Sequence, residues 1–261
     1  MGCQCAKIKE EQENELKKES EEGMNDIFKE DNNLNNKEEI FSLNNEEYNN
    51  EEQRQKDPKL KSSNKENNLD EDYIERLTEE KNAKYSNYPE KMLEIINSIR
   101  EDPASYADYI EDSIKNIIEE TDKNDETKTK LIYKKKVKVA LTRGEIAFRE
   151  AAEKLRNMEP VPPLELNENI IIPLPGTQEE IKDPTFLKEQ VKALRENTNI
   201  DLFFKDLIKV PEVSALLMIV DDSVKNPGRK RQALLNKDFK YVGINSHFIG
   251  KTFVAYFSFS K

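Results

Sequence analysis

Residues 216–243 read LLMIVDDSVKNPGRKRQALLNKDFKYVG, and they carry much of the information about the fold. They open with a continuous apolar run, Leu216–Val220, whose length suits a buried strand. They end in the first of two β-rich segments, which begins at Tyr241, and the second follows at Phe253–Phe259 after a turn at Gly250. The end of the chain is therefore predicted to form a small antiparallel sheet.

The residues before this stretch have helical periodicity. Met92, Ile95, Ile96 and Ile99 recur at three- and four-residue spacing, which predicts one buried helical face. A second helix is expected to start at Asp102 and Pro103, because an acidic N-cap followed by proline is typical of a first turn. Its predicted buried residues are Tyr106, Tyr109, Ile110, Ile114, Ile117 and Ile118.

A third helix is predicted at Arg143–Met158, with Phe148, Ala151, Ala152 and Leu155 on one side. The polar residues Glu119–Lys130 are predicted to form a loop. Lys134–Lys138 are interpreted as a solvated connector, with a lipid-facing patch as the alternative. Prolines make 159–164 an extended passage. Helices and strands together predict an α+β fold, with helices packed on the sheet.

The first third of the chain has a different composition. Glu, Asn, Lys, Asp and Gln dominate, and the scattered apolar residues cannot offset the cost of ordering the backbone, about 1 to 2 kcal/mol per residue. We therefore expect a long disordered acidic segment at 8–86 and a folded domain at 87–261. Two small apolar clusters, Asn25–Lys29 and Glu38–Leu43, are either docking motifs or spacer.

Overall composition narrows the function classes. The net charge is −11, and no basic stripe with interleaved aromatic residues occurs, so no nucleic-acid partner is expected. No apolar run reaches the about 18 to 20 residues that cross a bilayer, and no apolar signal segment follows a basic start. The two cysteines lie too close together to staple a fold. A reducing compartment is expected, and secretion is not.

The first seven residues, MGCQCAK, resemble an acylation signal. Removal of Met1 would free Gly2 for myristoylation, and Cys3 and Cys5 could then be palmitoylated. One myristoyl chain binds a membrane only marginally, so the second acyl chain is what makes the anchor stable. Ala6 departs from the usual Ser or Thr at this position. The expected location is the cytoplasmic face of a membrane.

Three passages of the predicted domain resemble the CAP superfamily, the fold of cysteine-rich secretory and plant pathogenesis-related proteins. They are Leu93–Ala107, Glu150–Asn167 and Leu216–Val242. In the third passage the residues that follow the family's order are Ile219, Asp221, Asp222, Val224, Arg231, Asn236, Asp238, Phe239, Val242 and Gly243. The resemblance covers about Tyr88 to Lys261, except for a poorly matching middle at 171–206. It implies an α/β/α sandwich.

This chain departs from the family at the cavity. The resemblance implies two histidines and two acids that can hold a divalent metal, but this chain has one histidine. Alignment on Asn236 places Lys230 where the family has its histidine, and Arg231 keeps the arginine position. The family's Gly-Glu-Asn-Ile motif is reduced to Asn199 and Ile200. No metal, no cofactor and no catalysis are therefore expected.

Two other features of the sequence are candidate sites. His247 is predicted in the turn between the last two strands, as an exposed loop residue and not a ligand, and one histidine without a nucleophile elbow makes no triad. Arg229, Lys230 and Arg231 form the densest positive cluster of the domain. It is interpreted either as a solvated loop or as a site for a phosphate or an acidic partner.

Three functions follow from these observations. The first is a non-catalytic binding module tethered to a membrane by acyl chains, with an unidentified protein or lipid partner. The second is a structural subunit of a cytoskeletal or ciliary assembly, because a stable core survives loss of a site. The third and most remote is a metal-dependent hydrolase, which the missing ligands disfavour.

Overall fold

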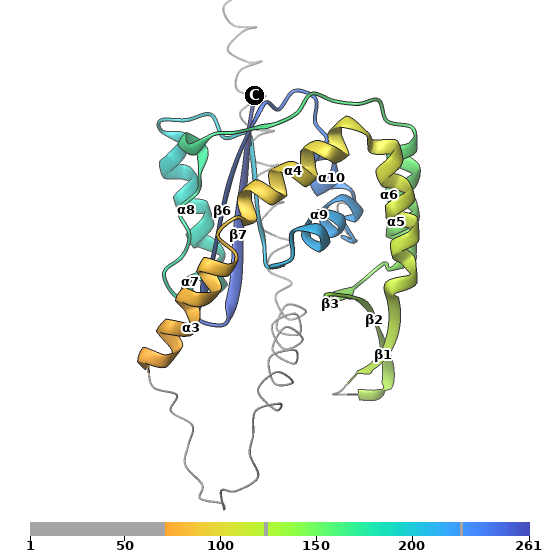
Figure 1. The fold of residues 1–261 in the computed structure, drawn as a ribbon, viewed down its shortest axis with the longest axis horizontal. Helices are drawn as coiled ribbons and strands as arrows, with labels where there is room; N and C mark the ends of the chain where they lie inside the picture. The colour runs from red at the N-terminus through yellow and green to blue at the C-terminus, as the bar shows by residue number, and fades with distance from the viewer. Residues whose placement is uncertain (1–70, 123–124, 225–226) are drawn as a thin grey trace, which may run out of the picture. The chain divides into compact units, whose positions relative to one another are not determined.

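The computed structural model describes residues 71–122, 125–224 and 227–261 (Figure 1). All of them belong to one compact unit. The predicted acylation residues Gly2, Cys3 and Cys5 lie outside the described residues, as do the two candidate docking motifs. No helix in the described ranges is both long and apolar enough to cross a membrane.

The larger sheet has four strands in the order β4-β6-β7-β5. Their bounds are β4 Glu165–Leu166, β5 Leu202–Asp206, β6 Tyr241–Ile249 and β7 Thr252–Ser260. The predicted β6–β7 hairpin is confirmed, and its turn residue Gly250 has a φ of 60°. The sheet is mixed and not wholly antiparallel, because the short edge strand β4 runs parallel to β6.

Helices lie on both sides of this sheet, which confirms an α+β fold (Figure 1). One side carries α7 Gln178–Lys182 and α8 Pro184–Arg195. The other carries α4 Tyr88–Glu101, α9 Pro211–Val220 and α10 Arg229–Leu234. Beyond α9, α5 Pro103–Ser113 packs against α6 Glu145–Arg156. The first and third predicted helices correspond to α4 and α6.

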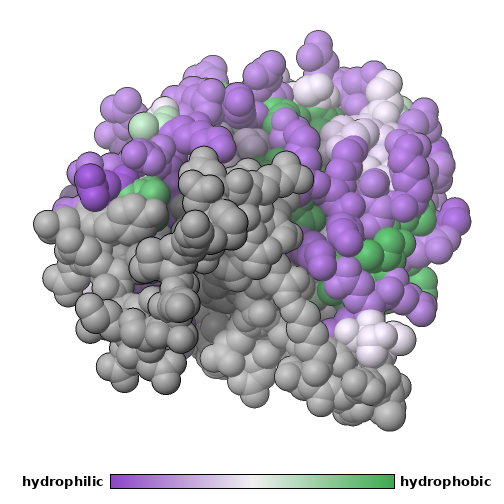
Figure 2. All heavy atoms as spheres, turned by 60° about the horizontal axis from the view of Figure 1, so that its bottom comes forward, coloured by the Kyte–Doolittle hydropathy of each residue, from purple (hydrophilic) through white to green (hydrophobic). Residues whose placement is uncertain are grey.

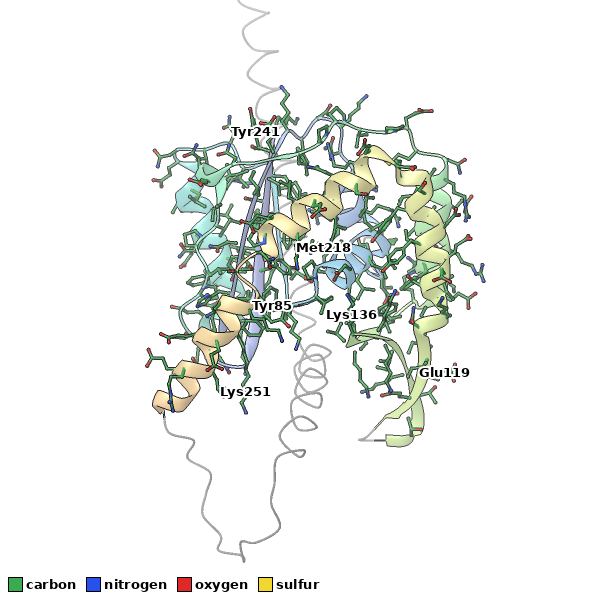
Figure 3. The ribbon with its side chains drawn as sticks, viewed as in Figure 1. Tyr85, Glu119, Lys136, Met218, Tyr241 and Lys251 are labelled. Atoms are coloured by element: carbon green, nitrogen blue, oxygen red, sulfur yellow. The ribbon has the colours of Figure 1, made fainter. Side chains whose placement is uncertain are left out.

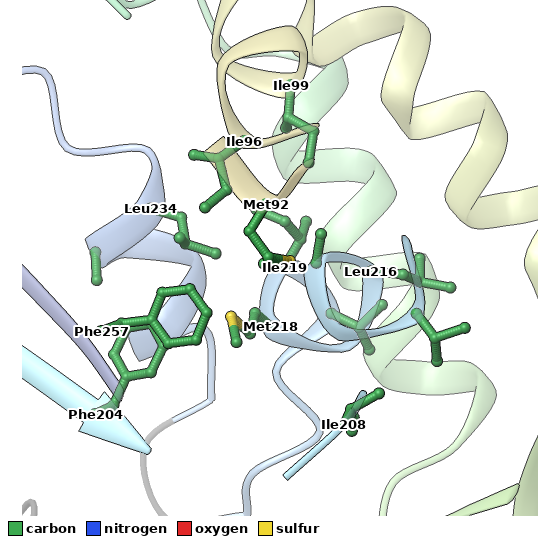
Figure 4. Close-up of a cluster of buried hydrophobic side chains, with 14 of the residues drawn as sticks. Met92, Ile96, Ile99, Phe204, Ile208, Leu216, Met218, Ile219, Leu234 and Phe257 are labelled. Carbon is green, nitrogen blue, oxygen red and sulfur yellow. The ribbon is translucent and has the colours of Figure 1, made fainter. Parts of the chain in front are cut away.

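The predicted strand at Leu216–Val220 is wrong, because these residues form the second half of helix α9. Pro211 opens the helix at a position where proline is favoured. Leu216, Met218 and Ile219 are all buried in the central cluster (Figure 4). The helix contacts α4, α6 and α10, and burial on all sides explains why its sequence is continuously apolar.

A second sheet replaces the predicted loop at Glu119–Lys130 and the predicted connector at Lys134–Lys138. Its three antiparallel strands are β1 Ile117–Asp122, β2 Asp125–Lys135 and β3 Val137–Leu141. Helix α5 ends at Ser113, so Ile117 and Ile118 belong to β1 and not to a helix. The inner face of this sheet is anchored by Tyr133, which is buried and stacks on Phe148 at 5.8 Å between ring centroids.

Regular structure also begins before the predicted start near Tyr88. Helix α3, Glu71–Lys84, precedes α4 and contacts β6. The contact is specific, because the Asn82 side chain bonds to the backbone of Phe248, and Tyr85 packs on the ring of Phe248 with 5.3 Å between centroids. These contacts join residues about 160 positions apart. The composition of either segment alone therefore could not predict these contacts.

Candidate functional site

The positions that resemble CAP motifs gather at the C-terminal end of α9. Asp221 ends the helix with a φ of 47°, and its buried carboxylate accepts a hydrogen bond from the backbone N–H of Lys230 at 2.7 Å. The Arg231 guanidinium donates to the carbonyls of Ile219 and Val220 at 3.0 and 3.3 Å. Burial lowers the pKa of Arg231, and Asp221 opposes that shift. The end of α9 is thereby tied to the start of α10.

Asp222 holds the turn that leads into α6. Its carboxylate accepts backbone N–H groups from Thr142, from Arg143 at 2.8 Å and from Gly144 at 2.9 Å. Burial raises the pKa of Asp222, while the three N–H donors act in the opposite direction. A carboxylate that accepts three backbone bonds is well satisfied by the protein itself. Both motif acids therefore hold backbone segments in place.

Lys230 lies close to a buried carboxylate that the sequence did not reveal. Asp206, the last residue of β5, is buried and accepts hydrogen bonds from Ser214 Oγ at 2.7 Å and from Ile208 N at 3.2 Å. Burial raises the pKa of Asp206, and the charge of Lys230 partly offsets this. The Lys230 Nζ lies 6.0 Å from the centroid of the Phe204 ring. Lys230 thus interacts electrostatically with Asp206 and lies over the Phe204 ring.

The hydroxyl of Tyr88 joins the buried hydrogen-bond network around Asp206. This hydroxyl lies 3.0 Å from Ser214 Oγ and 3.2 Å from the carbonyl oxygen of Ile208. Since Ser214 donates to Asp206, a chain of hydrogen bonds runs from Tyr88 through Ser214 to the carboxylate. Burial and Asp206 raise the pKa of Tyr88 well above its usual value. A serine beside a carboxylate can serve as a nucleophile, but Ser214 has no exposed surface. The hydrogen-bond network of Tyr88, Ser214 and Asp206 links α4, β5 and α9.

Asn236 and Arg100 form a second polar cluster beside α10. The Asn236 side chain accepts from the Asp238 N–H at 2.9 Å, and the Asn236 backbone carbonyl accepts from Arg100 Nη1 at 3.1 Å. Arg100 also donates to the carbonyls of Pro162, Leu234 and Phe239. Burial lowers the pKa of Arg100 to about 10, which still leaves the guanidinium charged at neutral pH.

His247 and the basic cluster Arg229–Arg231 lie in elements other than those predicted for them. His247 is exposed, as expected, but it lies within strand β6 and not in the turn. Its Nε2 is 3.0 Å from Asn82 Nδ2. Arg229, Lys230 and Arg231 form the first turn of α10, so the solvated-loop interpretation is wrong, and all three are partly buried.

Within the described ranges, no group of three or more His, Cys, Asp or Glu side chains is arranged to hold a metal ion. Comparisons with protein families, with curated proteins and with solved structures found no match for this chain. What the site can do must therefore be argued from its own geometry.

Proposed function

We propose that this chain is a non-catalytic, CAP-like binding module held at the cytoplasmic face of a membrane by its acylated N-terminus. A non-catalytic role is supported by the hydrogen-bond partners of the motif side chains. Asp221, Asp222 and Arg231 all bond to backbone groups of the protein's own helices and turns. Groups committed in this way stabilise the scaffold and are not available to a substrate.

The membrane part of the proposal rests on the sequence. Myristate on Gly2 and palmitate on Cys3 or Cys5 would supply the two chains that stable anchoring requires. The domain itself suits a partner bound largely through polar contacts. On the face drawn in Figure 2, most of the described surface is hydrophilic, and apolar side chains occur in small separate groups.

The test is metabolic labelling of the full chain with alkyne analogues of myristate and palmitate, followed by mild detergent extraction of the source cells. We expect both labels in the wild type, loss of both in Gly2→Ala, and loss of palmitate alone when Cys3 and Cys5 are replaced by serine. Detergent should release the wild-type chain.

An unlabelled chain that stays in the detergent-insoluble pellet would contradict the tether and favour a structural subunit of an assembly. Stoichiometric zinc in the purified protein would contradict the non-catalytic role, because it would restore a metal-dependent site.

A further inference from the structure

Helix α3 covers one edge of strand β6. Strand β4 pairs only with Tyr241 and Val242, so from Gly243 to Ile249 this side of β6 has no strand partner within the described residues. The Asn82 side chain takes the place of such a partner. Its Oδ1 accepts from the Phe248 N–H at 2.6 Å, and its Nδ2 lies 3.4 Å from the Phe248 carbonyl oxygen. An open strand edge is a surface that another chain can pair with, and Asn82 of α3 closes this one at Phe248.

These bonds also determine which ring nitrogen of His247 carries the proton. The Phe248 N–H must face an acceptor, which fixes the orientation of the Asn82 amide and directs its NH₂ group at His247 Nε2, 3.0 Å away. Nε2 must therefore accept, and the ring proton must lie on Nδ1. A second proton would place an N–H against the NH₂ group, because both imidazole nitrogens are donors in the charged form.

The rest of the α3 contact adds apolar packing and positive charge. Tyr85 packs on Phe248 and Phe253, and Thr78 Oγ1 lies 3.4 Å from the Gly250 carbonyl oxygen. Figure 3 shows Tyr85 and Lys251 near the same end of the β6–β7 hairpin.

Lys81 from α3 lies beside this contact, with its Nζ 5.6 Å from the centroid of the Phe248 ring, and it interacts electrostatically with Lys251 from the hairpin turn and Lys209 from the segment after β5. Burial lowers the pKa of Lys81, and the charges of Lys209 and Lys251 lower it further.

We propose that α3 is a releasable strap over the edge of β6 and that protonation of His247 releases it. While the imidazole is neutral, Nε2 accepts from Asn82 and the strap stays closed. Uptake of a second proton by the ring converts this contact into a donor–donor clash. Release would open the backbone of His247–Ile249 to pairing with an extended peptide. The strap would work in the same way whether or not the chain is acylated.

The first measurement is the histidine tautomer in the full chain. Because the chain has one histidine, ¹⁵N-histidine labelling gives a single imidazole spectrum without assignment. We expect Nδ1–H with an unprotonated Nε2 at pH 7.5. The Nε2–H tautomer at this pH would overturn the proposal.

The second measurement is deuterium uptake by peptides from α3 and from the end of β6, expressed as protection factors at pH 7.5 and 5.0. Protection in the wild type should fall on the order of tenfold at pH 5.0, as expected from loss of one hydrogen bond. In His247→Gln, which keeps an acceptor but cannot take up a proton, it should stay within about twofold.

An equal response in the wild type and His247→Gln, or no response in the wild type, would overturn the proposal. Asn82→Ala removes the strap contact without touching the histidine, and it should lower protection of α3 at both pH values. Unchanged protection in Asn82→Ala would also overturn it. This variant keeps the test decisive if His247→Gln does not fold.

Discussion

Arg100 connects four backbone segments with one side chain. It is fully buried, and the partners that the structure gives it are carbonyl oxygens from the proline-rich passage, from α10 and from the residues between α10 and β6. Three residues earlier, Asn97 exchanges two hydrogen bonds with the backbone of Leu164. Both residues serve here to fasten the extended passage 159–164 to α4.

Asp206 should make the stability of the protein depend on pH. Burial raises its pKa above the usual 3.8, so the folded chain binds this proton more tightly than the unfolded chain does. Its favourable contribution is therefore present at low pH and is lost as the pH rises through the folded-state value. Asp206→Asn cannot titrate. Relative to the wild type, we therefore expect its free energy of unfolding to rise between pH 4 and pH 7.

Urea denaturation of both proteins at several pH values measures this difference. Asp238→Asn is the matched control, because Asp238 is exposed and its carboxylate is hydrated before and after unfolding. If the difference between Asp206→Asn and the wild type is the same at pH 4 and pH 7, the carboxyl does not titrate with folding.

At the scale of elements, Gly243 lets the segment at η4, Glu168–Ile170, approach the sheet. A Cβ at this position would lie 2.6 Å from Ser258 Oγ and 2.7 Å from the Ile170 carbonyl oxygen. Since Ser258 also donates to that carbonyl, neither atom can move away freely. Gly243→Ala should therefore destabilise the fold by about 2 kcal/mol.

Chemical denaturation compares this variant with Gly176→Ala, whose new Cβ would meet nothing closer than 3.7 Å. We expect the control to change the free energy of unfolding by less than about 0.5 kcal/mol. Equal effects at the two glycines would show that η4 does not pack closely on the sheet.

The elements that the sequence predicted correctly are those with a clear local signal, such as a helical period or a turn residue. Helix α4 and the β6–β7 hairpin show it clearly, because Met92, Ile96 and Ile99 follow a helical period and Gly250 marks the turn. Helix α9 has no such period, since it is buried on all sides, so its apolar run was ambiguous between strand and helix. In β2, the apolar residues Leu131–Tyr133 are flanked by Lys130, Lys134 and Lys135, and this polar composition resembles a loop.

The candidate site was predictable only in part, for a related reason. The sequence supplied the identities of Asp221, Asp222 and Arg231, but their hydrogen-bond partners lie on other elements. The pairing of Asp206 with Ser214 was not predicted, because it depends on how β5 and α9 are placed. No local pattern marks a polar residue that is satisfied by tertiary contacts.

At the scale of the whole molecule, strand β7 is the centre of the described part. All nine of its residues are buried, and β5 and β6 pair along its two sides. The hairpin partner β6 then depends on neighbours from distant parts of the chain. It receives β4 at one end and α3 at the other. The folded unit should therefore need α3, although α3 lies outside the region that the sequence predicted to be folded.

Two truncated chains test this dependence. A chain that starts at residue 71 keeps α3, whereas a chain that starts at residue 87 loses the two Asn82 bonds to Phe248 and the ring contact of Tyr85. Each hydrogen bond contributes about 1 kcal/mol and the aromatic contact a similar amount. We therefore expect the shorter chain to unfold with a free energy lower by about 2 kcal/mol or more. The chain from residue 71 should match the full chain in urea denaturation. Equal stability of the two truncated chains would place the boundary of the folded unit after α3.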